Sequence, residues 1–225
     1  MTSRGIVVFA CNGLYSMTSV ADAIKALEDS TPECGPVSER EDVRLCPIMM
    51  QMPPIQAMDA ALGSRLKRCT HLRLSTNQIA QIAGLDGMDS LQILSLGRNS
   101  IRKLHGAALA PVAGTLEQLW LSYNGITSLA GIEMLVNLQV LFMSNNQIEQ
   151  WEEVERLASL PKLSDLNLLG NPLHSQAKGE GSWRAEVLRR LPNLRTLDGV
   201  LVAEAERSLA LKGMHSARRP APQRA

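Results

Sequence analysis

One phrase, L-x-x-L-x-L-x-x-N-x-I/L, recurs five times along the chain and constrains its fold more than any other feature. In each copy an asparagine is followed, two positions later, by an isoleucine or a leucine that ends the phrase. Successive asparagines are 22, 25, 22 and 25 residues apart. The first copy has Cys69 in place of the first leucine. The five asparagines are Asn77, Asn99, Asn124, Asn146 and Asn171.

Each copy of the phrase predicts one short strand. The two leucines of its L-x-L triplet point to one side of the strand and the residue between them to the other. No single repeat can bury its own leucines, so the repeats must stack into one continuous core. The asparagine follows the strand where the chain turns inward, and its amide can bond the backbone groups that this turn buries. The sequence therefore predicts an α/β leucine-rich-repeat solenoid with a parallel β-sheet on its concave side and an asparagine ladder.

The segments between the predicted strands also have a regular pattern. Their apolar residues recur every three to four positions, a spacing typical of short helices or helical turns. We expect these segments on the convex side, with their apolar side chains in the core. Trp151 belongs to one of them and is expected to pack inside.

The ends of a solenoid need caps, because the last layer of leucines would otherwise face water. Ser19 and Asp22 form the signature of a capping box, which predicts a helix that begins at Val20. An irregular strand is expected at 43–45. A second helix should then lead into the first repeat, lined by Met58, Leu62 and Leu66.

At the C-terminal end, Trp183, Val187 and Leu191 mark one face of a helix. A last helix is expected from about Val202 to Lys212. The chain then divides into an extension at 1–16 that is disordered or not translated, an N-terminal capping region at 17–68, the solenoid with its C-terminal cap at 69–199, and a terminal helix with a basic mobile tail at 200–225.

Composition agrees with repeated aliphatic layers and disfavours several kinds of partner. The chain has 34 leucines, whereas aromatic residues make up only 3% of it. Its formal net charge of +1 lacks the strong field that binding to nucleic acid or an acidic membrane would need. The longest uncharged stretch, residues 5–21, is too polar for a membrane span. We expect a cytosolic protein with reduced cysteines that binds neither nucleic acid nor membrane.

The sequence offers no group of residues that could carry a reaction. Its four histidines lie far apart, with no partner at metal-ligand spacing. Its glycines match neither a P-loop nor a dinucleotide fingerprint. We therefore expect no enzyme activity, no cofactor and no metal, and take binding as the function.

Strand alternation also predicts which side chains line the concave sheet, the usual binding surface of such a solenoid. Most of them are small or polar, but four apolar ones from the middle repeats should lie side by side and mark a contact site, with Trp120 as its anchor. The alternative is that the last helix folds over this patch. The four are Ile93, Trp120, Val140 and Phe142, and the full set of expected partner-binding residues adds Arg73, Asn167 and Leu169.

Two runs are specific beyond the general repeat, Leu91–Asn99 around Gly97 and Leu116–Asn124 around Trp120. Together with Leu191–Gly199, they closely resemble the leucine-rich-repeat light chains of axonemal outer-arm dynein. The resemblance implies a non-catalytic subunit located in the cytoskeleton of cilia and flagella and monomeric outside the dynein complex. It also implies binding to the motor domain of an axonemal dynein heavy chain, near the microtubule-binding tip of the stalk, and regulation of motility.

The resemblance covers about residues 17–210 and has two departures. Residues 1–16 precede the family's usual start, as either an upstream initiation assignment or a lineage-specific extension. Arg207 falls on a charged functional position of the family's terminal helix, whereas Val200 and Ala203 replace the family's Met and Asp. A contact with tubulin is therefore left open, and the cations that could make it are Arg207, Lys212, Arg218 and Arg219.

Two other classes of repeat protein also stay open. A regulatory scaffold of the phosphatase-regulator type has repeats of similar length, although its usual array is longer and lacks the phrase around Trp120. An RNA-associated repeat protein is disfavoured by the small net charge and by the few basic residues expected on the concave sheet.

Overall fold

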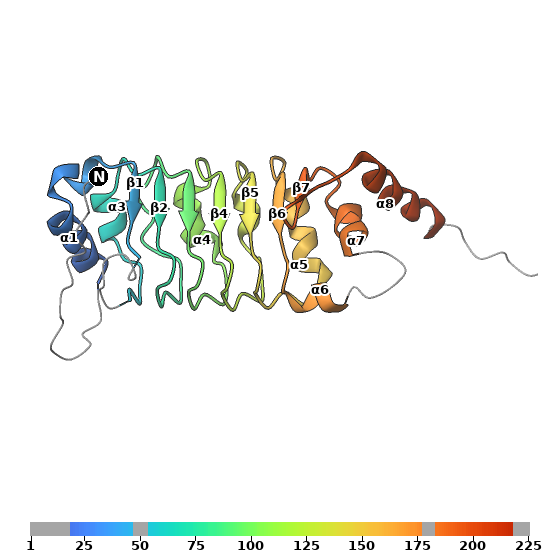
Figure 1. Ribbon diagram of the computed structural model, residues 1–225, viewed down its shortest axis with the longest axis horizontal. Helices are drawn as coiled ribbons and strands as arrows, with labels where there is room; N and C mark the ends of the chain where they lie inside the picture. Colours follow the sequence, from blue (N-terminus) through green and yellow to red (C-terminus); the bar gives the residue numbers. More distant parts are fainter. Residues whose placement is uncertain (1–18, 47–53, 177–182, 218–225) are drawn as a thin grey trace, which may run out of the picture.

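The structure, a computed structural model, describes residues 19–46, 54–176 and 183–217. Within these ranges, eight short strands form one sheet in chain order (Figure 1). All neighbours up to β7 are parallel, and β7 and β8 are antiparallel. The strands are β1 (Asp42–Arg44), β2 (His71–Arg73), β3 (Ile93–Ser95), β4 (Gln118–Trp120), β5 (Val140–Phe142), β6 (Asp165–Asn167), β7 (Thr196–Leu197) and β8 (Val200–Leu201).

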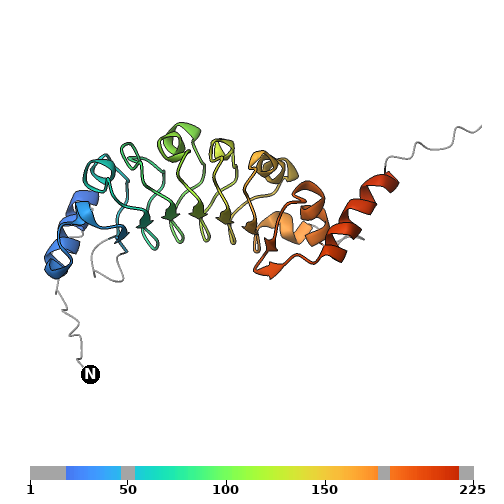
Figure 2. The ribbon, with the colours of Figure 1, turned by 90° about the horizontal axis from the view of Figure 1, so that it is seen from above.

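The predicted solenoid fold is confirmed. Figure 2 shows the strands along the inner side of an arc and the helices along its outer side. The central leucines of β2 to β6 stand in register and are fully buried, so they form the inner wall of one continuous aliphatic core. These leucines are Leu72, Leu94, Leu119, Leu141 and Leu166.

The convex segments differ between long and short repeats. Each 25-residue spacing of the ladder asparagines encloses an α-helical turn followed by a 3-10 turn: α4 (Gly106–Leu109) with η3 (Ala110–Val112), and α5 (Trp151–Arg156) with η5 (Leu157–Ser159). In the 22-residue spacing between Asn124 and Asn146, all of which the structure describes, the only helical element is η4 (Ile132–Met134). The three extra residues are therefore used on the outer side of the arc.

Trp151 on the convex side is half-buried and packs against the hydrophobic core, in agreement with the prediction that it packs inside. Its ring packs against Trp183, with 5.5 Å between the ring centroids. The guanidinium of Arg190 covers the ring at 4.1 Å from its centroid. The side chain therefore joins α5 and α7 at the edge of the hydrophobic core.

Each ladder asparagine makes the same three hydrogen bonds. The Oδ1 of Asn146 accepts from the Ile126 N–H at 3.0 Å, and its Nδ2 donates to the carbonyls of Leu121 and Met143, each at 3.0 Å. One amide thus bonds its own repeat and the repeat before it. Equivalent bonds are made by Asn77, Asn99, Asn124 and Asn171.

The residue before each ladder asparagine has a left-handed backbone. Glycine is the usual residue there, because a Cβ atom strains this conformation. Only the last of the five turns uses one. The positive φ angles are 63° at Thr76, 56° at Arg98, 59° at Tyr123, 55° at Asn145 and 75° at Gly170.

The N-terminal cap begins with α1 (Val20–Ser30), where Ser19 and Asp22 form the expected capping box. The chain continues through η1 (Pro32–Cys34) and η2 (Val37–Glu39) to β1. The prediction of one helix that contains Met58, Leu62 and Leu66 is wrong about the length of the helix, although all three residues are buried. The observed helix, α3, covers only Ala61–Arg65, because the Asp59 carboxylate accepts the Ala61 N–H at 2.8 Å and holds a turn before it.

The C-terminal cap contains α6 (Pro172–Gln176), α7 (Trp183–Arg190) and the hairpin of β7 and β8. The last helix, α8, runs over Glu204–Ala217, which begins two residues later and ends five residues later than expected. It packs against α7 and projects beyond the end of the sheet (Figure 2). The alternative in which the last helix covers the apolar patch is therefore wrong. Among the described residues, no helix has the length and apolarity needed to cross a bilayer.

Candidate partner-binding surface

The concave sheet brings the predicted aromatic pair together. The register places Trp120 of β4 directly beside Phe142 of β5. Their ring centroids lie 5.8 Å apart, and the ring planes are tilted by 32°. In the neighbouring column, Gln118 stands between Ile93 and Val140, so these two aliphatic residues do not touch across one strand pair.

The four apolar residues of this patch are half-buried, so each presents only part of its surface to a partner. Trp120 has a further peculiarity. Its indole Nε1 is buried and has no hydrogen-bond partner within the part of the chain that the structure describes. An unpaired buried donor costs about 1–3 kcal/mol, so this tryptophan stabilises the isolated fold less than a fully bonded one would.

Serine pairs connect the strands' C-terminal ends on the same side of the sheet. Ser75 and Ser95 lie 2.7 Å apart between their hydroxyl oxygens, and the Ser144 hydroxyl donates to Ser122 at 2.9 Å. These hydroxyls are already satisfied within the sheet. Leu169, which continues this edge after β6, exposes 39% of its surface.

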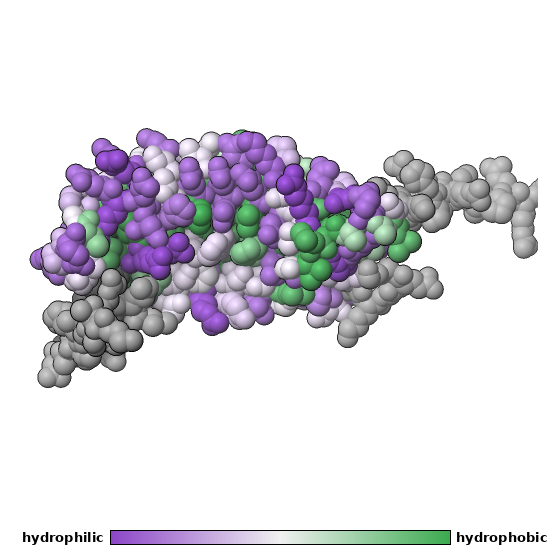
Figure 3. Space-filling model, turned by 45° about the horizontal axis from the view of Figure 1, so that its top comes forward, coloured by the Kyte–Doolittle hydropathy of each residue, from purple (hydrophilic) through white to green (hydrophobic). Residues whose placement is uncertain are grey.

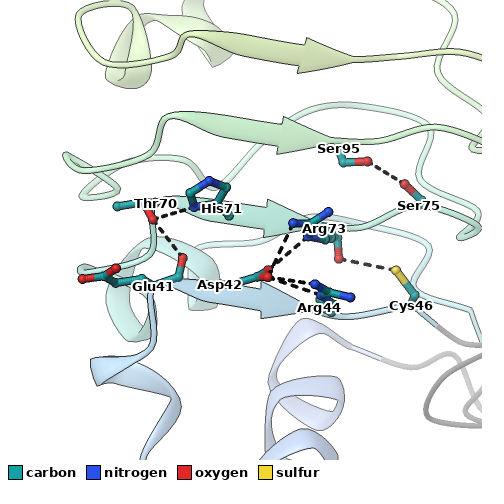
Figure 4. A network of polar contacts seen from close by, with 9 residues as sticks. All are labelled: Glu41, Asp42, Arg44, Cys46, Thr70, His71, Arg73, Ser75 and Ser95. Carbon is teal, nitrogen blue, oxygen red and sulfur yellow. Dashed lines mark hydrogen bonds and ion pairs between the residues drawn. The ribbon is translucent and has the colours of Figure 1, made fainter.

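Two arginines share one carboxylate at the N-terminal end of the concave sheet. One carboxylate, Asp42, lies between two guanidinium groups, 3.0 Å from Arg44 and 3.1 Å from Arg73 (Figure 4). Burial opposes the charge of Asp42, but hydrogen bonds from both arginines outweigh it and hold the pKa of this carboxyl below its usual value. The group of Asp42, Arg44 and Arg73 thus carries one net positive charge.

The other end of the concave sheet carries a carboxylate, Asp165, that no described residue pairs. Burial raises the pKa of Asp165 on β6. Among the described residues, no hydrogen bond or ion pair to its carboxylate compensates this burial. Asn167, two residues further on, accepts the Leu169 N–H at 3.2 Å. The expected site residues Arg73 and Asn167 thus lie at opposite ends of one sheet and do not form a single cluster.

A second apolar surface lies on the C-terminal cap and was not expected from the sequence. Leu201 exposes 77% of its surface, Leu209 70% and Val200 59%. Figure 3 shows hydrophobic surface as small spots along the middle of the solenoid and as a larger patch towards its C-terminal end. The available signal was Asp198-Gly199, a dipeptide typical of two-residue hairpin turns, which puts both residues of β8 at the open edge of the sheet.

The cations considered for tubulin are placed only in part. Arg207 belongs to the cap, because its guanidinium donates to the Leu194 carbonyl at 2.9 Å and lies 3.5 Å from Glu204. Lys212 is within α8, but its side chain lies outside the described part of the structure. Arg218 and Arg219 lie outside the described residues altogether.

Comparison with known proteins agrees with the repeat pattern. A leucine-rich repeat family model matches residues 70–222. Dynein axonemal light chain 1 of Chlamydomonas reinhardtii is 52% identical over 196 residues, which cover 86% of this chain and 95% of that protein. The chain belongs to the axonemal dynein light chain 1 family. The Homo sapiens member of the family is 50% identical over 189 residues, with 84% and 95% covered.

Solved structures relate the axonemal dynein light chain 1 family to other leucine-rich-repeat proteins. A chain in the Drosophila melanogaster SNF/U2A′ complex is 26% identical with a TM-score of 0.50, over 60% of this chain and 75% of that one. A Leptospira interrogans leucine-rich-repeat protein is also 26% identical, with a TM-score of 0.52 over 64% and 34%. Both support the same solenoid fold for this light chain.

Proposed function

We propose that this light chain is a non-catalytic subunit that binds an axonemal dynein heavy chain through its concave sheet. One observation carries the choice of surface. The aromatic pair of Trp120 and Phe142 stands half-exposed in the middle of the sheet, and the indole Nε1 has no hydrogen-bond partner among the described residues. Tryptophan is enriched among the residues that dominate interface energies.

The position on the heavy chain follows from the family resemblance. We place the contact on the motor domain, near the microtubule-binding tip of the stalk, in the axoneme of a cilium or flagellum. A rigid curved subunit there would regulate motility by contacting one state of the motor better than another. A motor domain whose microtubule affinity is the same with and without the light chain would contradict this role.

Direct contact with tubulin is a separate part of the proposal. Arg207 is engaged with the Leu194 carbonyl and is therefore a weak donor for a second partner. The contact is assigned to the remaining cations, Lys212, Arg218 and Arg219. Replacing these three by glutamine should reduce co-sedimentation of the light chain with microtubules without changing its binding to the heavy chain. Unchanged co-sedimentation would contradict the assignment.

The test of the heavy-chain surface is Trp120→Ala. Removing the ring should weaken binding to a recombinant axonemal dynein motor domain by about 2 kcal/mol or more, roughly 30-fold in Kd. Binding would be measured by titration. Trp120→Phe is the matched control, because it keeps an aromatic ring beside Phe142 and removes the unpaired N–H. It should retain more affinity than Trp120→Ala and be at least as stable as the parent chain.

Equal affinity of the parent chain and Trp120→Ala would exclude the concave sheet as the binding surface. The rival classes are tested by affinity isolation from ciliated cells. Recovery of a dynein heavy chain supports the proposal, whereas recovery of a phosphatase or an RNA-binding protein in its place would overturn it.

A further inference from the structure

The charged groups of the concave sheet are divided between its two ends. Arg44 and Arg73 share the single carboxylate of Asp42 at the β1–β2 end, which leaves one positive charge in excess (Figure 4). Asp165 on β6 is a negative charge with no bonded cation among the described residues. Between them lie the half-buried apolar residues of β3 to β5. A partner on this surface would meet cation, apolar patch and anion in that order.

The spacing of these groups fits a helix that crosses the strands. From β2 to β6 there are four strand spacings of 4.7–4.9 Å, about 19 Å in all, which corresponds to about 13 helical residues. The strand N–H and C=O groups already bond their neighbours within the sheet. An extended segment on the face of the sheet would therefore leave its own backbone unpaired, whereas a helix bonds its backbone internally.

We propose that the concave sheet binds one amphipathic helix of the heavy chain in a single direction. An acidic residue of that helix lies over β1 and β2, apolar residues contact Trp120 and Phe142, and a Lys or Arg pairs with Asp165. The inference rests on the proposed function, because it takes the concave sheet as the heavy-chain surface. Charge complementarity sets the orientation, since a reversed helix would place like charges together at both ends.

The test uses the full-length chain and a recombinant axonemal dynein motor domain. Asp165→Lys and Arg73→Glu should each weaken binding about tenfold. This loss of affinity should be larger at low ionic strength than at high ionic strength, because salt screens the charges. The double variant Arg73→Glu/Asp165→Lys keeps the net charge of the chain but reverses the order of charges along the sheet. It should bind more weakly than either single variant.

Recovery of parental affinity in the double variant would overturn the inference, because only net charge would then matter. Asp165→Asn is close to isosteric and replaces Asp165→Lys in the test if a lysine at this position prevents folding. It should also weaken binding, and no change would count against the pairing. Glu152→Gln removes an exposed carboxylate from α5 on the convex side and should have no effect.

The two proposals can fail separately. If Trp120→Ala abolishes binding and the charge variants do not affect it, the oriented helix is wrong and the concave surface stands. If neither Trp120→Ala nor the charge variants change the affinity, the heavy-chain surface itself is wrong.

Discussion

The ladder asparagines stabilise the fold at the scale of single residues. Asn146, which exposes only 1% of its surface, satisfies one buried backbone N–H and two buried carbonyls from adjacent repeats. No apolar side chain of similar size could do the same. The repeat therefore has a buried asparagine between two core residues, Met143 and Ile148.

We expect Asn146→Ala to lower the free energy of unfolding by about 1–3 kcal/mol, because at least one buried backbone group loses its partner. Urea denaturation followed by circular dichroism would measure the loss. Gln147→Ala, at the exposed neighbouring position, is the control and should stay within about 0.5 kcal/mol of the parent. Equal midpoints for the two variants would argue against the ladder as a source of stability.

Two cysteines differ in chemistry because of their surroundings. Burial raises the pKa of the Cys69 thiol to about 11, whereas Cys34 is exposed. The reactive form is the thiolate, so at pH 8 folded Cys69 is protonated in all but about one molecule in 10³. A maleimide should label Cys34 and leave Cys69 unmodified until the pH approaches 11 or the chain unfolds. Peptide mapping by mass spectrometry checks this. Rapid labelling of Cys69 at pH 8 would contradict its burial.

At this scale the sequence predicts positions better than partners. The alternation of the repeat correctly predicts that Trp120 stands beside Phe142, because strand register follows from the repeat itself. It does not show that Asp165 has no cationic partner among the described residues or that Arg207 bonds the Leu194 carbonyl. Those facts depend on which side chains of other elements lie nearby, and a local sequence pattern does not predict this.

Close backbone approaches between repeats act at the scale of elements. Gly63 of α3 lies against the next convex segment, where an added Cβ would stand 1.6 Å from the Asp86 carbonyl oxygen. No rotamer change can relieve a clash between two backbones. The stacking distance of the first repeats therefore depends on this glycine.

Gly63→Ala should destabilise the chain by about 2 kcal/mol or more, because the two segments must move apart. Gly114→Ala is the matched control, since nothing lies within 4 Å of the position of its Cβ. Thermal melts of both variants would be compared with the parent. A Gly63→Ala variant that melts with the control would show that the two segments are free to separate.

The elements that sequence reasoning missed lie in the caps. Periodicity predicts the strands of the solenoid because each repeat restates the previous one. The caps do not repeat, so the bounds of their helices and strands depend on individual turn residues. The Asp59 carboxylate shortens α3, and the Asp198-Gly199 turn, with φ angles of 55° and 77°, creates the β7–β8 hairpin. Asp198 also accepts the Leu168 N–H and the Trp183 indole N–H, which fastens that hairpin to the last repeat.

At the scale of the whole molecule, the two caps do different work. The N-terminal cap covers the first full repeat through β1 and α1, whose buried residues join the common core. In contrast, α8 packs against α7 outside the sheet and is fastened by the pair of Arg184 and Glu206. Loss of the first cap would expose the first layer of the core, whereas α8 contributes one described core residue, Ala210.

A chain that ends after Val202 should lose only the helical circular dichroism signal of α8 and melt within a few degrees of the parent. A chain that lacks residues 1–46 should aggregate, because an uncapped repeat presents its apolar layer to water. Size-exclusion chromatography and thermal melts distinguish the two outcomes. The opposite ranking of the two truncations would mean that α8, rather than α1 and β1, closes the core.

The alternation between long and short repeats has a consequence for how such a subunit can diverge. Strand spacing fixes the length of the inner rim, while the convex segments, with or without helical turns, set the length of the outer rim. The ratio of the two lengths determines how tightly the arc bends. Insertions of a few residues on the outer rim can thus change the curvature of the concave sheet, and with it the fit to a bound helix, while every contact residue stays the same.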